Sequence, residues 1–253
     1  MLLTVVIPMY NERDVIGQTL RTLAGTLEEA ASGTNGRGPF DRYAILVSDD
    51  GSDDGSAEIV RRVGRSLRLP HGSLRLLSSR VNHGKGRAVR DGMLAARGDL
   101  RLFTDSDLAY GADVLVSMAR EALDSGVGVL IGSRAADARG YAAYPPARRI
   151  ASKLYRDAVA VAAGFRYTDS QCGCKLFTAE AAERIFSLAR TDGWAFDLEA
   201  LLLADRLGIA VGEYPVRVLT HRASKVRLLR DSARMLGEIV RIRRYVNSLP
   251  QSP

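Results

Sequence analysis

The chain has 253 residues, of which 46% are hydrophobic and 26% are charged, and its formal net charge is +7. This length fits one globular domain with a substantial core. No stretch approaches the roughly 20 apolar residues of a membrane-spanning helix, and the amino terminus lacks a basic leader, so we expect a cytoplasmic protein.

The first 132 residues alternate short β-branched or leucine-rich runs with longer amphipathic runs. This alternation predicts a mostly parallel sheet covered by helices. Three of the strands end in acids or an arginine, at the edge where open α/β sheets bind ligands. The predicted strands are residues 2–8, 43–50, 73–79, 99–107 and 127–134, and the predicted helices are residues 13–30, 54–69, 84–96 and 111–124.

The alternation lapses after Arg134, where a basic helical stretch at 147–163 comes first and the segments "YTDSQCGCKLF" and "TDGWAFDLEALLLADRLG" follow. No Pro/Ser-rich linker marks a second domain, so the second half reads as an elaboration on the sheet. We expect one domain, with a nucleotide-sugar-binding half at 1–133, an acceptor-binding half at 134–226 and a basic amphipathic helix at 227–246.

The basic charge is concentrated near the carboxyl terminus. Residues 222–244 hold eight Lys or Arg against two acids, and apolar residues recur there at three- and four-residue spacing. This pattern predicts a basic amphipathic helix. The helix either packs its apolar stripe on the sheet domain or lies on an anionic membrane surface, which would place the protein at the inner face of the membrane.

Cys172 and Cys174 are the only cysteines of the chain. A single C-x-C is far short of a disulfide framework or a four-ligand zinc site, so we expect both residues to pack in the interior.

Two aspartates, Asp105 and Asp107, end the fourth predicted strand in "FTDSDLAY". Residues two apart on a strand project to one face, so both carboxylates can approach one cation. Mg²⁺ and Mn²⁺ are usually held by one or two carboxylates together with substrate phosphates. Taken alone, a D-x-D is equally a solvated turn.

Two further segments fall at the same predicted edge. Asp49 and Asp50 end the second strand, where a carboxylate can accept hydrogen bonds from a base or a ribose. Lys85 lies between two glycines at a helix start, where backbone N–H groups and an ammonium can meet a phosphate. Neither a P-loop, a dinucleotide G-x-G-x-x-G after the first strand, an H-E-x-x-H nor a G-x-S-x-G is present.

Seven segments in this order resemble the inverting GT-A glycosyltransferases of family 2. The segments are "VVIPMYNE", "SDDGSDDGS", "NHGKGRAVRDGM", "FTDSDLAY", "IGSR", "DSQCGCKLF" and "WAFDLE". The chain is most similar to the branch of dolichyl-phosphate β-glucosyltransferases and polyprenyl-phosphate glycosyltransferases. The resemblance implies a GT-A fold, a Rossmann-like nucleotide-sugar-binding sheet with helices on both faces.

The resemblance also implies site residues. It assigns metal binding, with Mg²⁺ or Mn²⁺, to Asp105 and Asp107, and catalytic positions to Arg134, Asp169 and Asp197. It places Arg134 near the phosphates, and Asp169 and Asp197 on the acceptor side. The implied substrate-binding residues are Pro8, Tyr10, Glu12, Asp49, Asp50, Lys85, Asp105, Ser106 and Lys225.

The expected reaction is metal-dependent, inverting transfer of a hexose, most simply glucose from UDP-glucose, to a polyprenyl or dolichyl phosphate. One alternative is a biosynthetic enzyme whose acceptor is a small-molecule hydroxyl, for which Asp197 or Asp169 would be an obligatory base. Another is a nucleotide-sugar-binding protein without turnover. No aromatic and basic platform of the kind that stacks bases is visible, so we expect no nucleic acid partner.

Some residues keep two interpretations. Asp197 and Glu199 fit either an acceptor site or a solvated helix face paired with local arginines. Trp194 and Phe196 fit either the core or the wall of an acceptor site.

Overall fold

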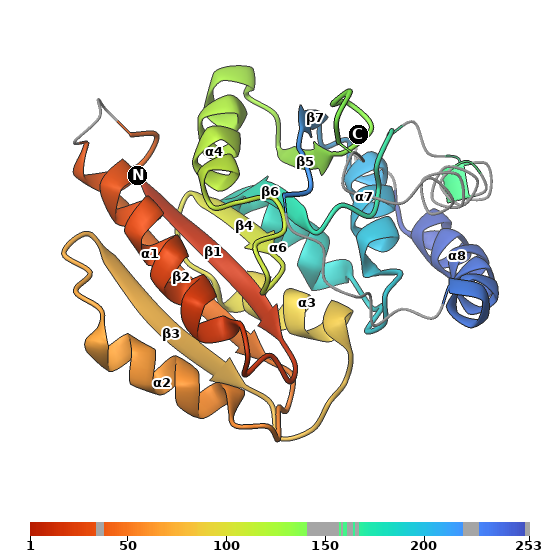
Figure 1. The fold of residues 1–253 in the computed structure, drawn as a ribbon. Helices are drawn as coiled ribbons and strands as arrows, with labels where there is room; N and C mark the ends of the chain where they lie inside the picture. The colour runs from red at the N-terminus through yellow and green to blue at the C-terminus, as the bar shows by residue number, and fades with distance from the viewer. Residues whose placement is uncertain are drawn as a thin grey trace.

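The computed structural model describes residues 1–33, 38–140, 157, 159–160, 164, 167–219 and 228–250, without the side chains of 228–236. Within these ranges a seven-stranded sheet has the order β3-β2-β1-β4-β6-β5-β7 (Figure 1). The strands are β1 (Leu2–Met9), β2 (Arg42–Asp49), β3 (Gly72–Ser78), β4 (Leu100–Thr104), β5 (Val129–Ser133), β6 (Cys174–Thr178) and β7 (Val211–Pro215).

The described helices lie between and after these strands. Thr178 ends β6 and accepts a hydrogen bond from Ala181 N, so the chain passes directly from strand to helix there. The helices are α1 (Ile16–Ser32), α2 (Ser56–Ser66), α3 (Lys85–Ala95), α4 (Asp113–Ser125), α6 (Ala179–Leu188), α7 (Phe196–Arg206) and α8 (Leu228–Ser248).

The predicted fold class is confirmed. Strand β1 pairs in parallel with β2 and β4, β2 with β3, and β5 with β7, whereas β6 runs antiparallel between β4 and β5. All five predicted strands and the four predicted helices between them are present. Strands β6 and β7 were not predicted, and β4 ends at Thr104, three residues before the predicted end.

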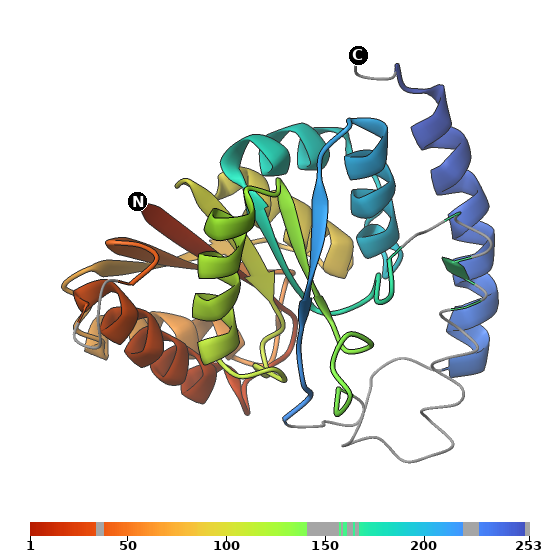
Figure 2. The same ribbon diagram turned by 90° about the horizontal axis from the view of Figure 1, so that it is seen from above.

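Two apolar layers cover the two faces of the sheet. Val5 and Ile7 of β1 face one layer, built mainly with α1, α2 and α4, and Val6 faces the other, built with α3, α6 and α7. Figure 2 shows these helix groups on opposite sides of the sheet, with α8 outside α7. Successive side chains of a strand point to opposite faces of the sheet. The apolar run from Val5 to Ile7 therefore contributes side chains to both layers.

The carboxyl-terminal helix packs on the domain. Ile239, Ile242 and Val246 are buried in the layer that contains α7, while Arg243 and Arg244 are exposed. Packing with a basic outer face, one of the two expected arrangements, is therefore confirmed for residues 237–248. The predicted helical stretch at 147–163 lies largely outside the described residues.

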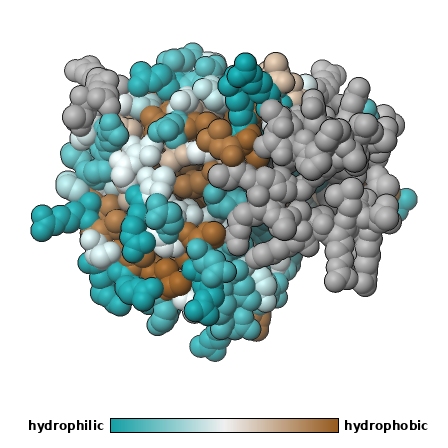
Figure 3. Space-filling view, in the orientation of Figure 1, coloured by the Kyte–Doolittle hydropathy of each residue, from teal (hydrophilic) through white to brown (hydrophobic). Residues whose placement is uncertain are grey.

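The surface in the orientation of Figure 1 is mainly hydrophilic, with hydrophobic groups gathered near its centre (Figure 3). Among the described residues, no helix is both long enough and apolar enough to cross a bilayer.

Candidate active site

The carboxyl ends of the parallel strands bring the predicted segments to one edge of the sheet. The loops after β1 and β2 are cross-linked: Asn11 Nδ2 donates to Asp53 Oδ1 at 2.9 Å, and Asp53 N donates to Asn11 Oδ1 at 3.1 Å. Asn11 has a φ of 52°, a left-handed conformation that asparagine tolerates. This rim carries the predicted residues Pro8, Tyr10, Glu12, Asp49, Asp50, Lys85, Asp105, Ser106 and Asp107.

The two acids that end β2 are buried and bonded to backbone. Asp49 Oδ1 accepts from Ser52 N at 3.1 Å. Asp50 accepts from His83 N at 2.9 Å and from Gly84 N at 2.7 Å, one bond to each carboxylate oxygen. Asp50 therefore fixes the loop that leads into α3. Contact of either acid with a nucleotide stays a prediction.

Lys85 begins α3 and turns its ammonium towards the acids that follow β4. Its Nζ lies 2.5 Å from Asp105 Oδ1, 5.4 Å from the centre of the Trp194 ring and 5.9 Å from that of Phe196. Burial alone would lower the pKa of Lys85, but Asp105, Asp197 and Asp107 outweigh it and raise that pKa above its ordinary value. The lysine is therefore a fixed positive charge.

The backbone at this helix start does not face a ligand. Gly86 N and Arg87 N both donate to Asp192 O, at 2.8 and 3.3 Å. A Cβ on Gly86 would lie 2.4 Å from Thr191 O, so the 190–194 loop packs directly on the first turn of α3. The N–H groups of Gly86 and Arg87 are therefore occupied and do not meet a phosphate, whereas phosphate binding by Lys85 stays a prediction.

Asp105 and Asp107 lie in a turn and not on a strand. Leu108 N donates to Asp105 O at 3.2 Å, and Ala109 N donates to Asp107 Oδ1 at 3.2 Å. The expectation that strand alternation aligns these carboxylates is wrong, because β4 ends at Thr104. The two acids are nevertheless close enough to interact: burial raises the pKa of Asp107, and the Asp105 carboxylate raises it further.

This pair of carboxylates fits a divalent cation bound together with a diphosphate. Their repulsion is the kind of interaction that a bound cation relieves, and Lys85 neutralises only one of them. In the described ranges, no cluster of three or more His, Cys, Asp or Glu side chains is arranged to hold a metal ion. Protein carboxylates would thus supply only part of the coordination, which is usual for Mg²⁺ held with substrate phosphates.

Arg134 and Asp169 form a buried pair beside this turn. Arg134 donates Nε to Asp169 Oδ2 at 2.6 Å and Nη2 to Oδ1 at 2.8 Å, and its backbone N bonds the same carboxylate at 3.0 Å. Burial would raise the pKa of Asp169, but these bonds outweigh it and lower that pKa. Asp169 has no exposed surface, and its carboxylate holds the guanidinium of Arg134 in place. Its expected position facing an acceptor stays a prediction.

Both cysteines are buried free thiols, as expected. Burial raises the pKa of Cys172 to about 11 and that of Cys174 well above its ordinary value, so neither supplies a thiolate at neutral pH.

Asp197 and Glu199 lie in the first turn of α7 and are both buried, which rules out the solvated helix face. Asp197 Oδ1 accepts from Lys175 Nζ at 2.5 Å. Burial raises the pKa of Asp197, while the ammonium groups of Lys175 and Lys85 oppose that rise. Glu199 Oε2 accepts from Arg190 N at 2.9 Å and Thr191 N at 2.7 Å, so it holds the 190–194 loop.

The two aromatic residues of this region differ in burial. Phe196 is 4% exposed and packs in the core, whereas Trp194 is 45% exposed and lies beside Lys85. Phe196 therefore belongs to the core and Trp194 does not, and a part for Trp194 in the wall of an acceptor site stays a prediction.

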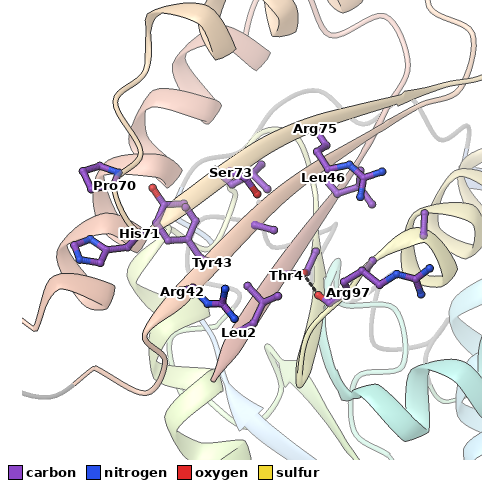
Figure 4. Close-up of a pocket in the computed structure, with 15 residues that line it drawn as sticks. Leu2, Thr4, Arg42, Tyr43, Leu46, Pro70, His71, Ser73, Arg75 and Arg97 are labelled. Atoms are coloured by element: carbon purple, nitrogen blue, oxygen red, sulfur yellow. Dashed lines mark hydrogen bonds between the residues drawn. The ribbon is translucent and has the colours of Figure 1, made fainter.

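A cavity of about 340 Å³ lies at the other end of β1, β2 and β3 (Figure 4). Thr4 Oγ1 donates to Arg97 O beneath it, and Arg42 and Arg75 are on its wall. It opens at the amino ends of the strands, whereas open α/β sheets bind ligands at the carboxyl ends. The cavity is therefore separate from the acidic rim.

The sequence profile of glycosyl transferase family 2 matches residues 4–186, which include the whole rim described above. The chain belongs to glycosyl transferase family 2. It is a glycosyltransferase, as its resemblance to that family implied.

Two curated relatives and one solved structure show how far the similarity extends. A dolichyl-phosphate beta-glucosyltransferase of Dictyostelium discoideum is 34% identical over 96% of this chain and 75% of its own length. One of Saccharomyces cerevisiae is 32% identical over 95% and 74%. A crystal structure of glucosyl-3-phosphoglycerate synthase from Mycobacterium tuberculosis, in complex with Mn²⁺, UDP and phosphoglyceric acid, superimposes with a TM-score of 0.64. It shares 20% identity and covers 99% of this chain and 80% of its own, which supports the fold.

Two buried residues of this glycosyltransferase were missed by sequence reasoning: Lys175 and Gly173. Lys175 had a usable signal, because it is one of only four lysines and interrupts an apolar strand in "CGCKLF". Gly173 lies so close to the rim that an added Cβ would be 2.0 Å from Asp105 Oδ2. Lys225, a predicted substrate-binding residue, lies outside the described residues.

Proposed function

We propose that this glycosyltransferase transfers a hexose, with inversion, from a nucleotide sugar to a polyprenyl phosphate, and that UDP-glucose is the donor. The observation that carries the proposal is the Lys85–Asp105 pair, at 2.5 Å, on the carboxyl edge of the sheet with Asp107 beside it. The names of the two relatives, which cover most of this chain, support dolichyl phosphate as the acceptor class.

The cations of the rim suit the departing diphosphate. Transfer breaks the bond between the anomeric carbon and the diphosphate, so negative charge grows on the leaving group. Lys85 supplies an ammonium to that charge. Arg134 supplies a guanidinium, which Asp169 orients before substrate arrives. Charges held in place in advance need no reorganisation during the reaction.

Asp105 and Asp107 would hold Mg²⁺ or Mn²⁺ against the diphosphate. The ion would supply Lewis-acid neutralisation of the leaving group. The residues of the chain define where it binds: Lys85 anchors one oxygen of Asp105, and Ala109 N anchors one oxygen of Asp107.

The acceptor half of the reaction places fewer demands on the protein. A phosphate monoester with a second pKa near 6 is largely dianionic at pH 7, so it can attack without a general base. Asp197 then orients the transferred sugar by accepting a hydrogen bond from a hydroxyl. Trp194 borders this side of Lys85 and is exposed enough to contact the sugar or the acceptor.

A hydroxyl acceptor is the second candidate, and the environment of Asp197 favours it. One carboxylate oxygen is bonded to Lys175, and burial raises the pKa of the group towards the range in which general bases work. In this version Asp197 would remove the proton of the hydroxyl. Alanine at position 197 would then abolish transfer to a hydroxyl, whereas transfer to a phosphate would retain part of its rate.

The architecture suggests how the protein could contact a lipid acceptor in a membrane. We propose one GT-A domain, in which residues 1–133 bind the donor and 134–226 bind the acceptor, followed by the helix at 227–246. The exposed arginines near the end of α8, including Arg241, Arg243 and Arg244, would make peripheral contact with an anionic membrane.

Donor selectivity is tested by a thermal-shift panel of UDP, GDP and their sugars, with and without Mn²⁺. A ligand that binds only the folded state raises the melting temperature according to its concentration relative to Kd. We expect the largest rise for UDP-glucose with Mn²⁺. A rise for GDP sugars alone would exclude UDP-glucose as the donor.

Substitution of the acidic pair tests the metal site. We expect Asp105→Asn and Asp107→Asn each to remove the Mn²⁺-dependent part of the shift and to reduce turnover at least tenfold, about 1.4 kcal/mol in the barrier. Asp113→Asn, at an exposed acid a few residues further on, is the matched control and should change neither. Retention of metal dependence and turnover by both rim variants would exclude this assignment.

A further inference from the structure

Lys175 is a lysine in the middle of the sheet with no exposed side-chain surface. Its Nζ donates to Cys172 O at 2.7 Å and to Asp197 Oδ1 at 2.5 Å. An ammonium is costly to bury unless it is paired and hydrogen-bonded, and both conditions hold here. The lysine is therefore fixed in one position by groups from β6 and α7.

The partner carboxylate is engaged on one side only. Asp197 Oδ1 bonds Lys175, whereas Oδ2 has no hydrogen-bond donor among the described residues. The Asp197 side chain keeps 8% of its surface exposed. One oxygen is therefore anchored, and the other remains available to a ligand.

The pair adjoins the rim that binds the donor in the proposed function. Lys175 follows Gly173, whose backbone packs directly on Asp105, and its Nζ lies 5.5 Å from the centre of the Phe103 ring. On the other side, Asp197 is close enough to Lys85 for its charge to raise the pKa of that lysine. The anchored carboxylate is therefore next to the lysine that carries the leaving-group charge.

The charged groups that face Asp197 come from three elements. Lys175 of β6 and Lys85 of α3 favour its ionised form, and Asp105, after β4, disfavours it. Glu199, on the same helix, is turned away to Arg190 N and Thr191 N. Of the favourable groups, only Lys175 is bonded to Asp197.

We propose that Lys175 is a positioning residue for sugar transfer: it holds Oδ1 of Asp197 so that Oδ2 faces the substrate as an ionised hydrogen-bond acceptor. The inference rests on the proposed function, since it assigns Asp197 a part in transfer. It does not depend on the acceptor class, because Oδ2 can accept from a sugar hydroxyl or from an attacking hydroxyl. A pair that only fills the interior would have no such effect on transfer.

The test measures nucleotide-sugar turnover against pH in Lys175→Met and Lys175→Gln. Methionine removes charge and hydrogen bonds, and glutamine keeps a donor without the charge. In both we expect kcat at pH 7 to fall at least tenfold and the acidic limb of the profile to move up by about one pH unit or more, because the buried carboxylate loses its main stabilising charge. The KM for the donor should change less than about threefold.

Two further variants distinguish a positioning role of Lys175 from a role in packing alone. Lys175→Met with Asp197→Asn removes both charges, so it should melt at a higher temperature than Lys175→Met alone, yet its turnover should stay at least tenfold below that of the wild type at every pH. Arg101→Met is the matched control, because Arg101 is a buried cation at the other end of β4 bonded to Met93 O and Glu183. Its melting temperature should fall while its pH profile stays that of the wild type.

The outcomes are distinct. A wild-type protein that turns over no nucleotide sugar would refute the proposed function. An active wild type with an unchanged pH profile and turnover in Lys175→Gln would overturn the role of Lys175 and leave that function standing. Turnover near the wild-type level in the double variant would show that the pair is only structural and would also overturn the inference. If Lys175→Met does not fold, the turnover and pH profile of Lys175→Gln test the role of Lys175.

Discussion

At the scale of single residues, three pairs of opposite charges lie at the centre of the site, and Asp107 lies beside one of them. Lys85 pairs with Asp105, Arg134 with Asp169 and Lys175 with Asp197, each at 2.5 to 2.6 Å. Asp107 has no cation partner of its own among the described residues, and its pKa is raised. An added cation would therefore stabilise the ionised form of Asp107.

Replacing the buried acid Asp169 should destabilise the fold. Asp169→Asn leaves Arg134 without its buried partner, and breaking such a pair costs about 3–5 kcal/mol in the free energy of unfolding. The pKa of Asp169 is lowered by Arg134, so its stabilising effect is present above its unfolded-state pKa and is lost as pH falls through the lower folded-state value. Urea unfolding should show a larger difference between variant and wild type at pH 7 than at pH 3.

The control for this prediction is Glu180→Gln, which breaks a pair with Arg184 in which Glu180 is 79% exposed. Such surface pairs contribute about 0–1 kcal/mol. Equal losses in the two variants, or a loss in Asp169→Asn that does not shrink between pH 7 and pH 3, would contradict the role given to Asp169.

At the scale of elements, the backbone immediately before β6 packs on the rim, because Gly173 lies against Asp105. Gly173→Ala would place a Cβ 2.0 Å from Asp105 Oδ2, so the carboxylate must move. We expect the variant to fold but to bind the donor with Mn²⁺ at least tenfold more weakly, about 1.4 kcal/mol, as measured by calorimetric titration.

Gly25→Ala is the matched control for that substitution. Gly25 lies on the exposed side of α1 with no atom within 4 Å of an added Cβ. Alanine should stabilise the helix there by about 0.5–1 kcal/mol and leave donor affinity unchanged. Unchanged affinity in Gly173→Ala as well would show that Asp105 does not need its observed position.

The sequence predicted β1 to β5 because apolar runs and helical periods alternate there, and it predicted the rim because parallel strands end on one edge. Strand β6 was not predicted because one of its five residues is a lysine, and a lysine in a sequence suggests a solvent-exposed position. The sequence did not predict the partners of Asp50 and Asp169, since a motif identifies an acid but not its partner. The partners, His83 N and Arg134, are 33 and 35 residues away.

At the scale of the whole molecule, α8 packs the carboxyl-terminal part of the chain against α7. Ile239 is fully buried against the layer that contains α7, and Val240 beside it is 48% exposed. Ile239→Ala should lower the free energy of unfolding by about 2–5 kcal/mol, whereas Val240→Ala should change it little.

Calorimetry distinguishes this arrangement from a loosely attached helix. If α8 is part of the single domain, Ile239→Ala lowers the temperature of one cooperative transition. A separate low-temperature transition, with the main one unchanged, would show that α8 melts independently.

The order of the strands has a consequence for synthesis. Both neighbours of β5 in the sheet, β6 and β7, come later in the chain, and β6 also separates β5 from β4. When β5 leaves the ribosome, the strand that must lie between it and β4 is about 40 residues from being made, several seconds at ordinary translation rates. A nascent chain halted at residue 133 would therefore expose an unpaired apolar strand, which is the kind of surface that chaperones bind.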